Sequence, residues 1–307
     1  MKYKDFLNKY AEEALAHDKE DAAVLMLLED ASGLSNTKLF LALEDEVPNE
    51  VSNKFMQKYD RYLNHNEPVQ YLIGYACFYG YDFIVNKDVL IPRPETEELV
   101  ENVLLKYDKY FKGQKVNVCD LATGSGCIAV TLAKEEKNMN VTATDISKEA
   151  LAVAKENALK MGVNINFKEG DMLAPLEDMK FDIFVSNPPY IPDNEIVDPL
   201  VKDNEPNVAL FGGSDGLKFY RIILRDLKKH LNDRALIAFE HGYDKKIEIE
   251  EIARTYFNDA RIENLKDLEG RDRMTFIYVN LDWYECNYIS NRYSIWYRYK
   301  DFWCWWY

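Results

Sequence analysis

The sequence predicts an α/β fold in which a mostly parallel sheet follows a small helical bundle. From residue 115 onward, short apolar runs typical of strands alternate with longer stretches that have helical periodicity. Strands are expected at 115–121, 140–146, 164–169, 181–186, 234–240, 261–268 and 273–280, and helices at 125–137, 147–161, 217–231 and 244–257. Because helices between strands act as crossover connections, the strands pair in parallel. The last two strands, separated by Gly270-Arg-Asp-Arg273, are expected to form an antiparallel hairpin on the edge.

The first 68 residues predict a separate helical domain. Apolar residues recur at helical spacing, as at Phe6, Tyr10 and Ala14, and residues 3–66 contain no convincing strand, so four short helices are expected. Residues 69–94 are interpreted as a connector, since aromatic and β-branched residues on both sides of a glycine predict a hairpin over 75–85. The α/β domain then covers residues 95–282.

Residues 283–307 break this pattern. All five tryptophans lie between Trp283 and Trp306, and the segment has neither an amphipathic period nor turn residues. We interpret it as an aromatic-rich extension outside the fold, with a tail that contacts a membrane or a partner protein as the alternative. Deleting residues 283–307 is therefore expected to leave activity intact.

Composition restricts the classes of partner. The formal net charge of −15 at pH 7 argues against non-specific attachment to nucleic acid, which requires a basic face. The five cysteines show neither a C-x-x-C pair nor a metal-ligand spacing, which is typical of reduced thiols in a cytosolic protein. The amino terminus lacks the apolar core of a signal peptide, and no run approaches the roughly 20 apolar residues of a membrane helix. We expect a cytoplasmic protein without a metal, a membrane span or direct contact with nucleic acid.

A glycine-rich turn follows the first predicted strand of the sheet. Gly124 and Gly126 let the backbone approach a ligand closely, and ligands of open α/β sheets bind beyond the carboxyl ends of the strands. Together with Asp145, the turn also matches a dinucleotide-binding fingerprint. Asp120 would repel a pyrophosphate but can accept from an amine or hold a cationic ligand, which favours S-adenosylmethionine over NAD. A turn that serves tight packing is the structural alternative.

The next two strands also end in acidic residues. Asp145 is placed to bind ribose hydroxyls through charge-assisted hydrogen bonds. Asp171 and Met172 would flank an adenine, although a helix cap explains Asp171 equally well. The candidate cofactor-binding residues are Asp120, Ala122, Thr123, Gly124, Ser125, Gly126, Asp145, Ile146, Asp171, Met172 and Asn187.

The strand at 181–186 runs into Asn187-Pro188-Pro189-Tyr190. Proline cannot donate to a sheet and biases the preceding residue towards extended geometry, so this tetrapeptide ends the strand and fixes the direction of its carbonyl groups. Rigid acceptors beside a flat ring suit a planar group with N–H bonds, either a carboxamide or the exocyclic amine of a base. A turn with an aromatic plug is the structural alternative.

With these motifs the chain resembles the class I S-adenosylmethionine-dependent methyltransferases and, within them, the protein-(glutamine-N5) methyltransferases that modify peptide-chain release factors. The resemblance runs from about Glu67 to Val279. It rests on Glu67-Pro-Val-Gln-Tyr-Leu-Ile-Gly74, Val89-Leu-Ile-Pro-Arg-Pro-Glu-Thr-Glu97, Asp120-Leu-Ala-Thr-Gly-Ser-Gly126, Asn187-Pro-Pro-Tyr190, Glu205-Pro-Asn-Val-Ala-Leu-Phe-Gly-Gly213 and Gly270-Arg-Asp-Arg-Met274. The chain departs from the family at Ala122, where glycine is common and where alanine fits if the backbone is not left-handed, and in the tail beyond about Leu281.

The resemblance implies a Rossmann-like class I methyltransferase sheet with an N-terminal helical domain that recognises the substrate protein. It implies methyl transfer from S-adenosylmethionine, without a metal, to the glutamine side chain in the Gly-Gly-Gln motif of release factors. A ribosomal-protein glutamine and an adenine or guanine amine of nucleic acid remain alternative acceptors. An NAD-binding oxidoreductase and a catalytically silent interaction module are the alternatives from other classes.

Asn187, Pro188 and Tyr190 are the expected catalytic residues, and with Pro189 and Arg93 they form the expected substrate-binding set. We expect the Asn187 side-chain oxygen and the Pro188 carbonyl each to accept one N–H of the substrate amide, while Tyr190 packs against its plane. Arg93 is expected to order the loop over the cofactor.

Five further ionisable residues carry weaker functional signals. Glu95 and Glu97 fit equally well as carboxylates at the positive end of a helix dipole. His230 and His241, like His65, are interpreted as core or solvated residues, because none has a spacing that indicates metal binding or nucleophilic catalysis.

Overall fold

The computed structural model describes residues 1–281, so the predicted extension at 283–307 lies outside the described residues. The chain divides into two compact units. Within residues 1–281, Met1–Tyr75 and Val197–Asn204 form a helical unit, and Ala76–Ile196 with residues 205–281 form a sheet unit. Residues 76–94, which the sequence indicated as a connector, therefore group with the sheet.

The helical unit contains the four helices expected over residues 3–66, together with two short helices that the sequence did not predict. They are α1 (Tyr3–Ala16), α2 (Ala22–Ser32), α3 (Asn36–Leu41), α4 (Asn49–His65), α5 (Val69–Ile73) and α9 (Pro199–Lys202). Phe6, Tyr10, Phe55 and Tyr59 pack as an aromatic cluster with ring centroids 4.6–5.1 Å apart. Helical spacing placed these rings on the inner faces of α1 and α4, and their burial gives the unit its own core.

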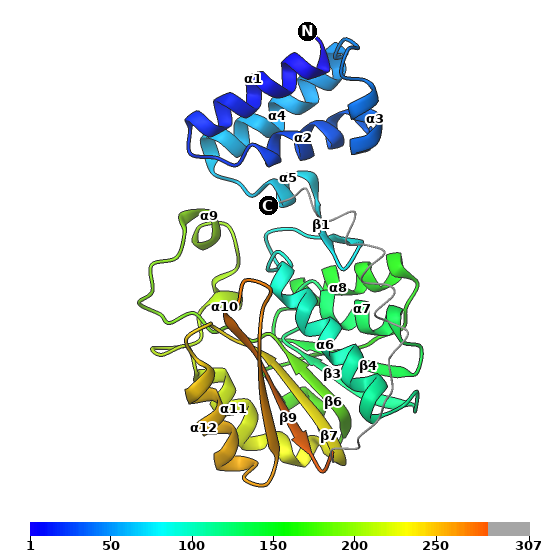
Figure 1. Ribbon diagram of the computed structural model, residues 1–307, viewed down its shortest axis with the longest axis vertical. Helices are drawn as coiled ribbons and strands as arrows, with labels where there is room; N and C mark the ends of the chain where they lie inside the picture. The colour runs from blue at the N-terminus through cyan, green and yellow to red at the C-terminus, as the bar shows by residue number, and fades with distance from the viewer. Residues whose placement is uncertain (282–307) are drawn as a thin grey trace. The chain divides into compact units, whose positions relative to one another are not determined.

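The sheet unit is built on a seven-stranded sheet with the order β5-β4-β3-β6-β7-β9-β8 (Figure 1). The strands are β3 (Val116–Leu121), β4 (Met139–Asp145), β5 (Asn166–Glu169), β6 (Phe181–Ser186), β7 (Leu231–Glu240), β8 (Arg261–Lys266) and β9 (Asp272–Val279). All neighbours pair in parallel except β9, which runs antiparallel to β7 and β8. The predicted parallel sheet with an antiparallel edge hairpin is confirmed. Since β3 lies between β4 and β6, the strand order reverses there, which creates a topological switch point.

Helices cover both faces of the sheet (Figure 1). The first face carries α6 (Pro94–Tyr110), α7 (Cys127–Glu135) and α8 (Lys148–Met161), and the second carries α11 (Lys218–Leu227) and α12 (Lys246–Tyr256). Strand residues alternate between the two cores, as Val118 and Ile183 join the first and Cys119 and Phe184 the second. Burial on both faces explains why these strands are continuous apolar runs.

Smaller elements complete the unit. The hairpin expected at 75–85 is confirmed as β1 (Tyr75–Phe78) and β2 (Tyr81–Ile84), with Gly80 at φ +76° in the turn. The structure adds α10 (Asn207–Leu210) and two 3-10 turns, η1 (Ala174–Leu176) and η2 (Lys228–His230). The helix predicted to continue to residue 231 instead ends at Leu227. Its last turn tightens into η2, because Leu231 already pairs with Phe181 of the sheet.

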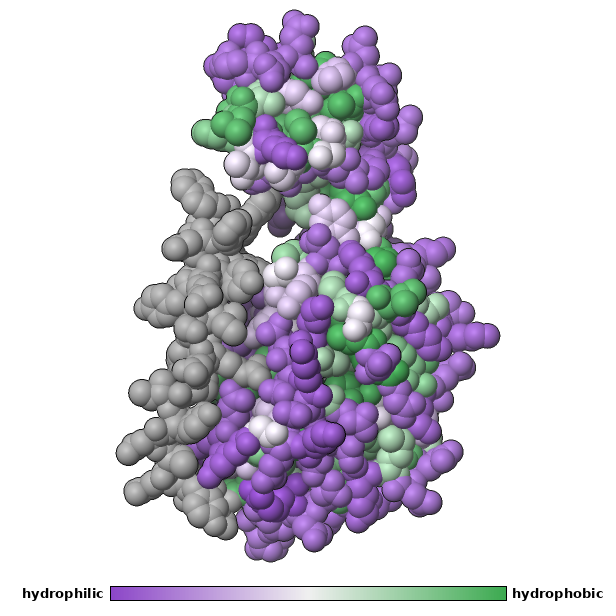
Figure 2. Space-filling model, turned by 90° about the vertical axis from the view of Figure 1, so that its right-hand side faces the viewer, coloured by the Kyte–Doolittle hydropathy of each residue, from purple (hydrophilic) through white to green (hydrophobic). Residues whose placement is uncertain are grey.

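Figure 2 shows a mainly hydrophilic face with hydrophobic residues in small groups. Within residues 1–281, none of the helices has both the length and the apolar character that crossing a bilayer requires.

Candidate functional site

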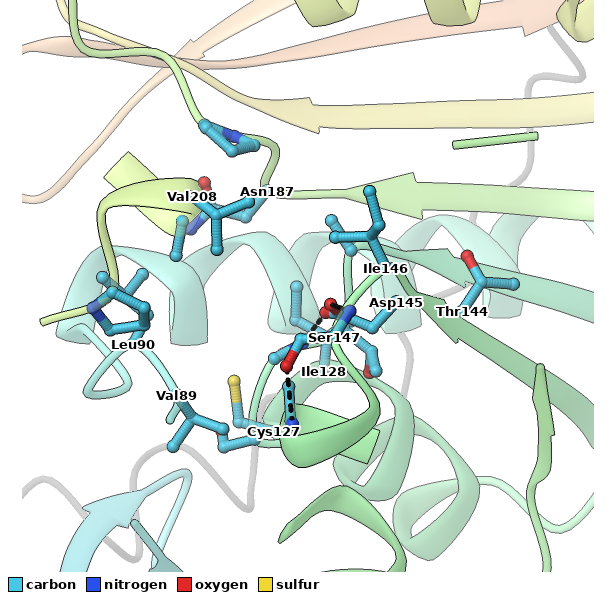
Figure 3. Close-up of a pocket in the computed structure, with 18 of the residues that line it drawn as sticks. Val89, Leu90, Cys127, Ile128, Thr144, Asp145, Ile146, Ser147, Asn187 and Val208 are labelled. Carbon is cyan, nitrogen blue, oxygen red and sulfur yellow. Dashed lines mark hydrogen bonds between the residues drawn. The ribbon is translucent and has the colours of Figure 1, made fainter. Parts of the chain in front are cut away.

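A cleft lies at the carboxyl ends of the strands beside the switch point, entirely within the sheet unit (Figure 3). It holds about 1000 Å³ of empty space, part of which is open to solvent. Of the predicted site residues, those that line it are Arg93, Ala122, Thr123, Gly124, Ser125, Asp145, Ile146, Asp171, Met172, Asn187 and Pro189. Asp120, Gly126, Pro188 and Tyr190 are not among its lining residues. The structure thus brings the predicted segments together at one cleft. The sequence did not show which of their residues face the cleft and which lie behind it.

The glycine turn after β3 is tied to the end of β4. Asp145 accepts the Gly124 N–H at 2.9 Å through Oδ2 and the Ser147 N–H at 2.9 Å through Oδ1. Burial raises the pKa of Asp145, while these backbone hydrogen bonds act in the opposite direction. A Cβ built on Gly124, which has φ +55°, would meet no atom within 4 Å. The backbone at Gly124 therefore faces open space, beside a half-buried carboxylate.

The other two residues of this turn with positive φ have different surroundings. A Cβ on Gly126 would lie 3.0 Å from the Ala154 Cβ, so this glycine allows α7 and α8 to pack closely. Ala122 has φ +59°, which is the left-handed region. The condition under which alanine fits without strain is therefore not met, in a turn whose next residue is tied to β4 by the hydrogen bond from the Thr123 N–H to the Thr144 carbonyl. A left-handed alanine costs about 1–2 kcal/mol, and the family's glycine avoids this cost.

Asp120 holds the turn from beneath. It is fully buried, and its Oδ2 accepts from the Thr123 hydroxyl at 2.5 Å and from the Ala129 N–H at 3.1 Å. Burial raises the pKa of this carboxyl to about 7 against the effect of these hydrogen bonds. Its Oδ1 is buried and has no hydrogen-bond partner within the described part of the chain. A ligand in the cleft thus meets the turn that Asp120 shapes, and not the Asp120 carboxylate itself.

The turn after β6 is rigid and is supported from behind. The strand ends at Ser186, as the prolines predicted. Ile191 then bridges to Phe211, and the Gly212 N–H donates to the Ile191 carbonyl at 2.8 Å. A Cβ on Gly212 would lie 2.5 Å from the Pro189 carbonyl oxygen, and one on Gly216 would lie 2.2 Å from that of Tyr190. Residues 205–216 therefore press directly against the backbone of this turn.

The Asn187 amide belongs to a buried hydrogen-bonded chain. Its Nδ2 donates to the Thr96 hydroxyl at 3.1 Å, and that hydroxyl donates to Oε2 of Glu240 at 2.7 Å. With its nitrogen held in this way, the Asn187 side-chain oxygen is left for another donor. Figure 3 shows Asn187 and Val208 on one wall of the cleft, away from Cys127.

Sequence reasoning missed the role of Thr96 and did not single out Glu240. Thr96 lies inside the Ile91–Glu97 motif, which was interpreted as a helix start. In the structure the Thr96 side chain does not cap the helix. Glu240 is an acid at the end of a long apolar strand, and that position was the one available signal.

Comparison with known proteins agrees with this architecture. The PrmC N-terminal domain model matches residues 7–74, and the methyltransferase small domain model matches residues 98–205. The release factor glutamine methyltransferase of Bacillus subtilis (strain 168) is 44% identical over 260 residues, covering 83% of this chain and 90% of the relative. Those of Bacillus cereus and Streptococcus pneumoniae are 41% and 38% identical, covering 79% and 90% of this chain and 87% and 98% of theirs. The chain belongs to the release factor glutamine methyltransferase family.

A solved structure supports the fold alone. The catalytic domain of hMettl16, in a crystal structure with the MAT2A 3'UTR hairpin 6, matches with a TM-score of 0.51 at 17% identity. The match covers 66% of this chain and 78% of that one. The class I methyltransferase fold predicted from the sequence is therefore confirmed.

In this family member, an ion pair joins two of the motif stretches. Arg93 pairs with Glu205 through its guanidinium group, and the second Glu205 oxygen accepts the Ile91 N–H at 3.1 Å. The Glu205 side chain is 2% exposed, whereas that of Arg93 is 34% exposed and lines the cleft. Arg93 thus ties the loop before α6 to residues 205–213, and Glu205 is the partner that the sequence did not indicate.

The remaining candidates of this methyltransferase lie away from the cleft. Glu95 and Glu97 are in the first turn of α6, and burial raises the pKa of Glu97 to about 7 while the Tyr79 N–H donates to it. His230 and His241 are buried, and the His65 side chain is 64% exposed. Among residues 1–281, no three His, Cys, Asp or Glu side chains are grouped so that they could hold a metal ion.

Proposed function

We propose that this protein transfers a methyl group from S-adenosylmethionine to the side-chain amide nitrogen (N5) of the glutamine in the Gly-Gly-Gln motif of peptide-chain release factors, in support of translation termination. The observation that carries the proposal is the Asn187 amide, whose nitrogen is held by Thr96 and whose oxygen is left for a donor at the wall of the cleft. Membership of the release factor glutamine methyltransferase family supports the same acceptor.

The residues around the glycine turn fit S-adenosylmethionine. Each Asp145 oxygen accepts one backbone N–H and keeps further lone pairs, which ribose hydroxyls can use. Gly124 offers backbone that no side chain covers, and Ile146, Asp171 and Met172 supply cleft walls on which an adenine can rest. Bound S-adenosylmethionine supplies an electrophilic methyl group on a positively charged sulfonium. We assign Asp120 and Gly126 to this site through the turn that they shape.

The turn after β6 would hold the acceptor. An amide nitrogen is a poor nucleophile, since its lone pair is delocalised into the carbonyl group. The Asn187 oxygen and the Pro188 carbonyl would each accept one N–H of the glutamine amide, which fixes its plane and favours the positive charge that develops on nitrogen. Holding nitrogen and methyl group in near-attack geometry can contribute about 7–11 kcal/mol. No general base is needed before attack, because the proton becomes acidic after the methyl group has arrived.

Pro189 and Tyr190 would act from different sides of this turn. Pro189 lines the cleft beside Asn187 and offers the acceptor a flat apolar surface. The Tyr190 ring packs against the core cluster of the second sheet face, and burial raises the pKa of its hydroxyl. We assign Tyr190 to support of the turn, in place of the direct contact with the amide that the sequence suggested.

The partner would be a release factor in the cytoplasm. We assign its recognition to the helical unit, which the PrmC N-terminal domain model matches, and assign Arg93 to ordering the loop at the cleft wall. The net charge of −15 supports a protein acceptor over a nucleic acid, because phosphates require a basic face.

The test is methyl transfer from S-adenosylmethionine with a labelled methyl group to purified release factors. A release factor whose Gly-Gly-Gln glutamine is replaced by alanine is the control acceptor, and mass spectrometry maps the label. We expect one methyl group on the glutamine side chain and none on the control. Label on another residue, or on added nucleic acid instead of the release factor, would overturn the proposal.

A further inference from the structure

Three side chains from distant parts of the sheet unit form one hydrogen-bonded line that ends at the cleft. Glu240 stands at the end of β7, Thr96 in the first turn of α6, and Asn187 directly after β6. Glu240 and Thr96 are 1% and 3% exposed. The two hydrogen bonds measure 2.7 Å from the Thr96 hydroxyl to Glu240 and 3.1 Å from Asn187 Nδ2 to that hydroxyl. Thr96 holds the Asn187 nitrogen, but Glu240 has no role in the chemistry described so far.

The direction of this line follows from the chemistry of a hydroxyl group. Threonine has one proton to donate, and an ionised carboxylate can only accept. When Thr96 gives its proton to Glu240, it has lone pairs alone to offer to Asn187. The Asn187 amide must then turn its N–H bonds towards Thr96, which leaves its oxygen for the acceptor. The carboxylate at one end of the line thereby decides which face the amide shows at the other end.

Burial of the Glu240 carboxylate is energetically unfavourable, and packing alone does not explain why an acid occupies this position. A buried carboxylate is destabilising unless it is paired, and an apolar residue at this point of the strand would avoid the cost. Its neighbour Arg273 is engaged with Asp267 at 3.2 Å. The Tyr220 hydroxyl donates to the Glu240 backbone carbonyl and not to its side chain. The side-chain carboxylate therefore faces Thr96 and Asn187, and besides the hydrogen bond from Thr96 it interacts directly with the Asn187 amide.

We propose that Glu240, acting through Thr96, is the positioning residue that sets the orientation of the Asn187 amide for the incoming substrate amide. The inference rests on the proposed function, because it specifies how the acceptor site of that reaction is held. Thr96 transmits the orientation, and Asn187 is the group that touches the substrate.

Protonation of Glu240 would reverse the line. Burial raises the pKa of Glu240 to about 7, while Thr96, Asn187 and Arg273 oppose the shift and Glu95 adds to it. The other titratable groups that face it are Tyr190, Tyr220 and Cys127. Below pH 7 the carboxyl group can donate to Thr96, whose own proton is then free to point at the Asn187 oxygen. The transfer rate should therefore fall as the pH drops through about 7.

Stability should change in the opposite direction. Because the folded pKa of Glu240 lies above the ordinary value of 4.5, the folded state binds its proton more tightly than the unfolded state does. The stabilisation is complete below pH 4.5 and is lost as the pH rises through about 7. The pH range in which Glu240 contributes most to stability is thus the range in which Asn187 is wrongly oriented. A Glu240 that is buried for structural reasons alone would change stability with pH but would not change the transfer rate.

The first test measures single-turnover methyl transfer at saturating cofactor between pH 5.5 and 8.5. In Glu240→Gln we expect a loss of about 10-fold to 100-fold at pH 8 and no rate step near pH 7, with cofactor affinity within a few-fold. Thr96→Val should behave in the same way, whereas Thr96→Ser should retain the rate and the step because it retains the hydroxyl group. Glu97→Gln is the matched control. The Glu97 pKa is also raised to about 7, but Glu97 accepts from the Tyr79 backbone. This variant should therefore keep both the wild-type transfer rate and the rate step near pH 7.

A second measurement does not depend on turnover, and its first part needs only the wild-type protein. In the wild-type protein with its asparagine side chains 15N-labelled, the Asn187 amide signals should titrate near pH 7, and they should stop titrating in Glu240→Gln. An Asn187 signal that is insensitive to pH in the wild type, or a Glu240→Gln variant with the wild-type rate and pH step, would overturn the inference. Absence of glutamine methylation by the wild type, with the Asn187 titration intact, would instead overturn the proposed function alone.

Discussion

The turns that follow β3 and β6 lie at the same end of one sheet, yet they fix their backbones in opposite ways. The turn from Leu121 to Gly126 uses positive φ at three residues and is tied down by the carboxylates of Asp120 and Asp145, which accept its N–H and hydroxyl groups. The turn from Asn187 to Tyr190 uses prolines, which have no N–H, and presents carbonyl groups that residues 205–216 support from behind. The first turn brings the Asp145 carboxylate and uncovered Gly124 backbone to the cleft, whereas the second brings the Asn187 amide to it.

This difference indicates a division of labour. The Asp145 carboxylate and the uncovered glycine backbone suit the ribose hydroxyls of a cofactor, whereas the Asn187 side-chain oxygen suits the N–H bonds of an amide. Damage to the second turn should therefore reduce transfer without releasing the cofactor. Substitutions in the first turn should weaken cofactor binding without changing the transfer rate at saturating cofactor.

The largest effect is expected from Asn187→Ala. This variant removes the side-chain acceptor, and the methyl transfer rate should fall on the order of 10²–10³-fold. Because Asn187 belongs to the turn after β6 and its side chain is hydrogen-bonded to Thr96 and not to the glycine turn, the cofactor Kd measured by calorimetry should stay within a few-fold. A variant that retains a near-normal rate would show that the acceptor is held by other groups.

Gly216→Ala tests the support of the second turn. Its Cβ would lie 2.2 Å from the Tyr190 carbonyl oxygen, so the turn must shift, and displacements of about 1 Å in reacting groups cost about 100-fold in rate. Gly80→Ala is the matched control, since Gly80 has φ +76° against +75° for Gly216 but has no neighbour within 4 Å. Both variants should lose about 1–2 kcal/mol from backbone strain in denaturant unfolding. If both also retain the transfer rate, residues 205–216 do not position the turn.

Asp145→Asn tests the first turn. Loss of the charge weakens hydrogen bonds to the ribose and to Gly124, and a hydrogen bond to a charged group contributes about 1.5–3 kcal/mol. Cofactor affinity should fall about 10-fold to 100-fold in a titration. Glu169→Gln, at the exposed end of β5, is the control and should bind the cofactor normally. Equal cofactor affinity in the two variants would show that Asp145 does not bind the cofactor.

The smallest effect is expected from Ala122→Gly. Glycine adopts φ +59° without steric cost, so the free energy of unfolding should rise by up to about 1 kcal/mol. Ala133→Gly, within α7, should lower it by about the same amount because glycine is a poor helix former. Chemical denaturation of both variants measures the difference. A lower stability in Ala122→Gly would show that the left-handed alanine is not strained in this turn.

The sequence predicted the parts of the site that are local. Two prolines are enough to end β6 at Ser186, and an acid after an alternating apolar run is enough to place Asp145 at the end of β4. Helical spacing likewise placed the aromatic core of the helical unit. Each of these inferences depends on residues that are neighbours in the chain.

The residues that the sequence did not reveal act over long separations. Thr96 and Glu240 are 144 residues apart, and Arg93 and Glu205 are 112 apart, so no spacing rule connects them. The left-handed backbone of Ala122 was also missed, because its conformation is imposed by how the turn is tied to β4. Sequence patterns locate the ends of strands, whereas packing decides which side chain faces the cleft.

The division of labour between the two turns is tested most directly by measuring single-turnover transfer in Asp145→Asn and Asn187→Ala across a range of cofactor concentrations. The account predicts that saturating cofactor restores Asp145→Asn to within a few-fold of the wild-type rate and leaves Asn187→Ala on the order of 10²–10³-fold slower. Rescue of Asn187→Ala by added cofactor, or failure to rescue Asp145→Asn, would contradict it.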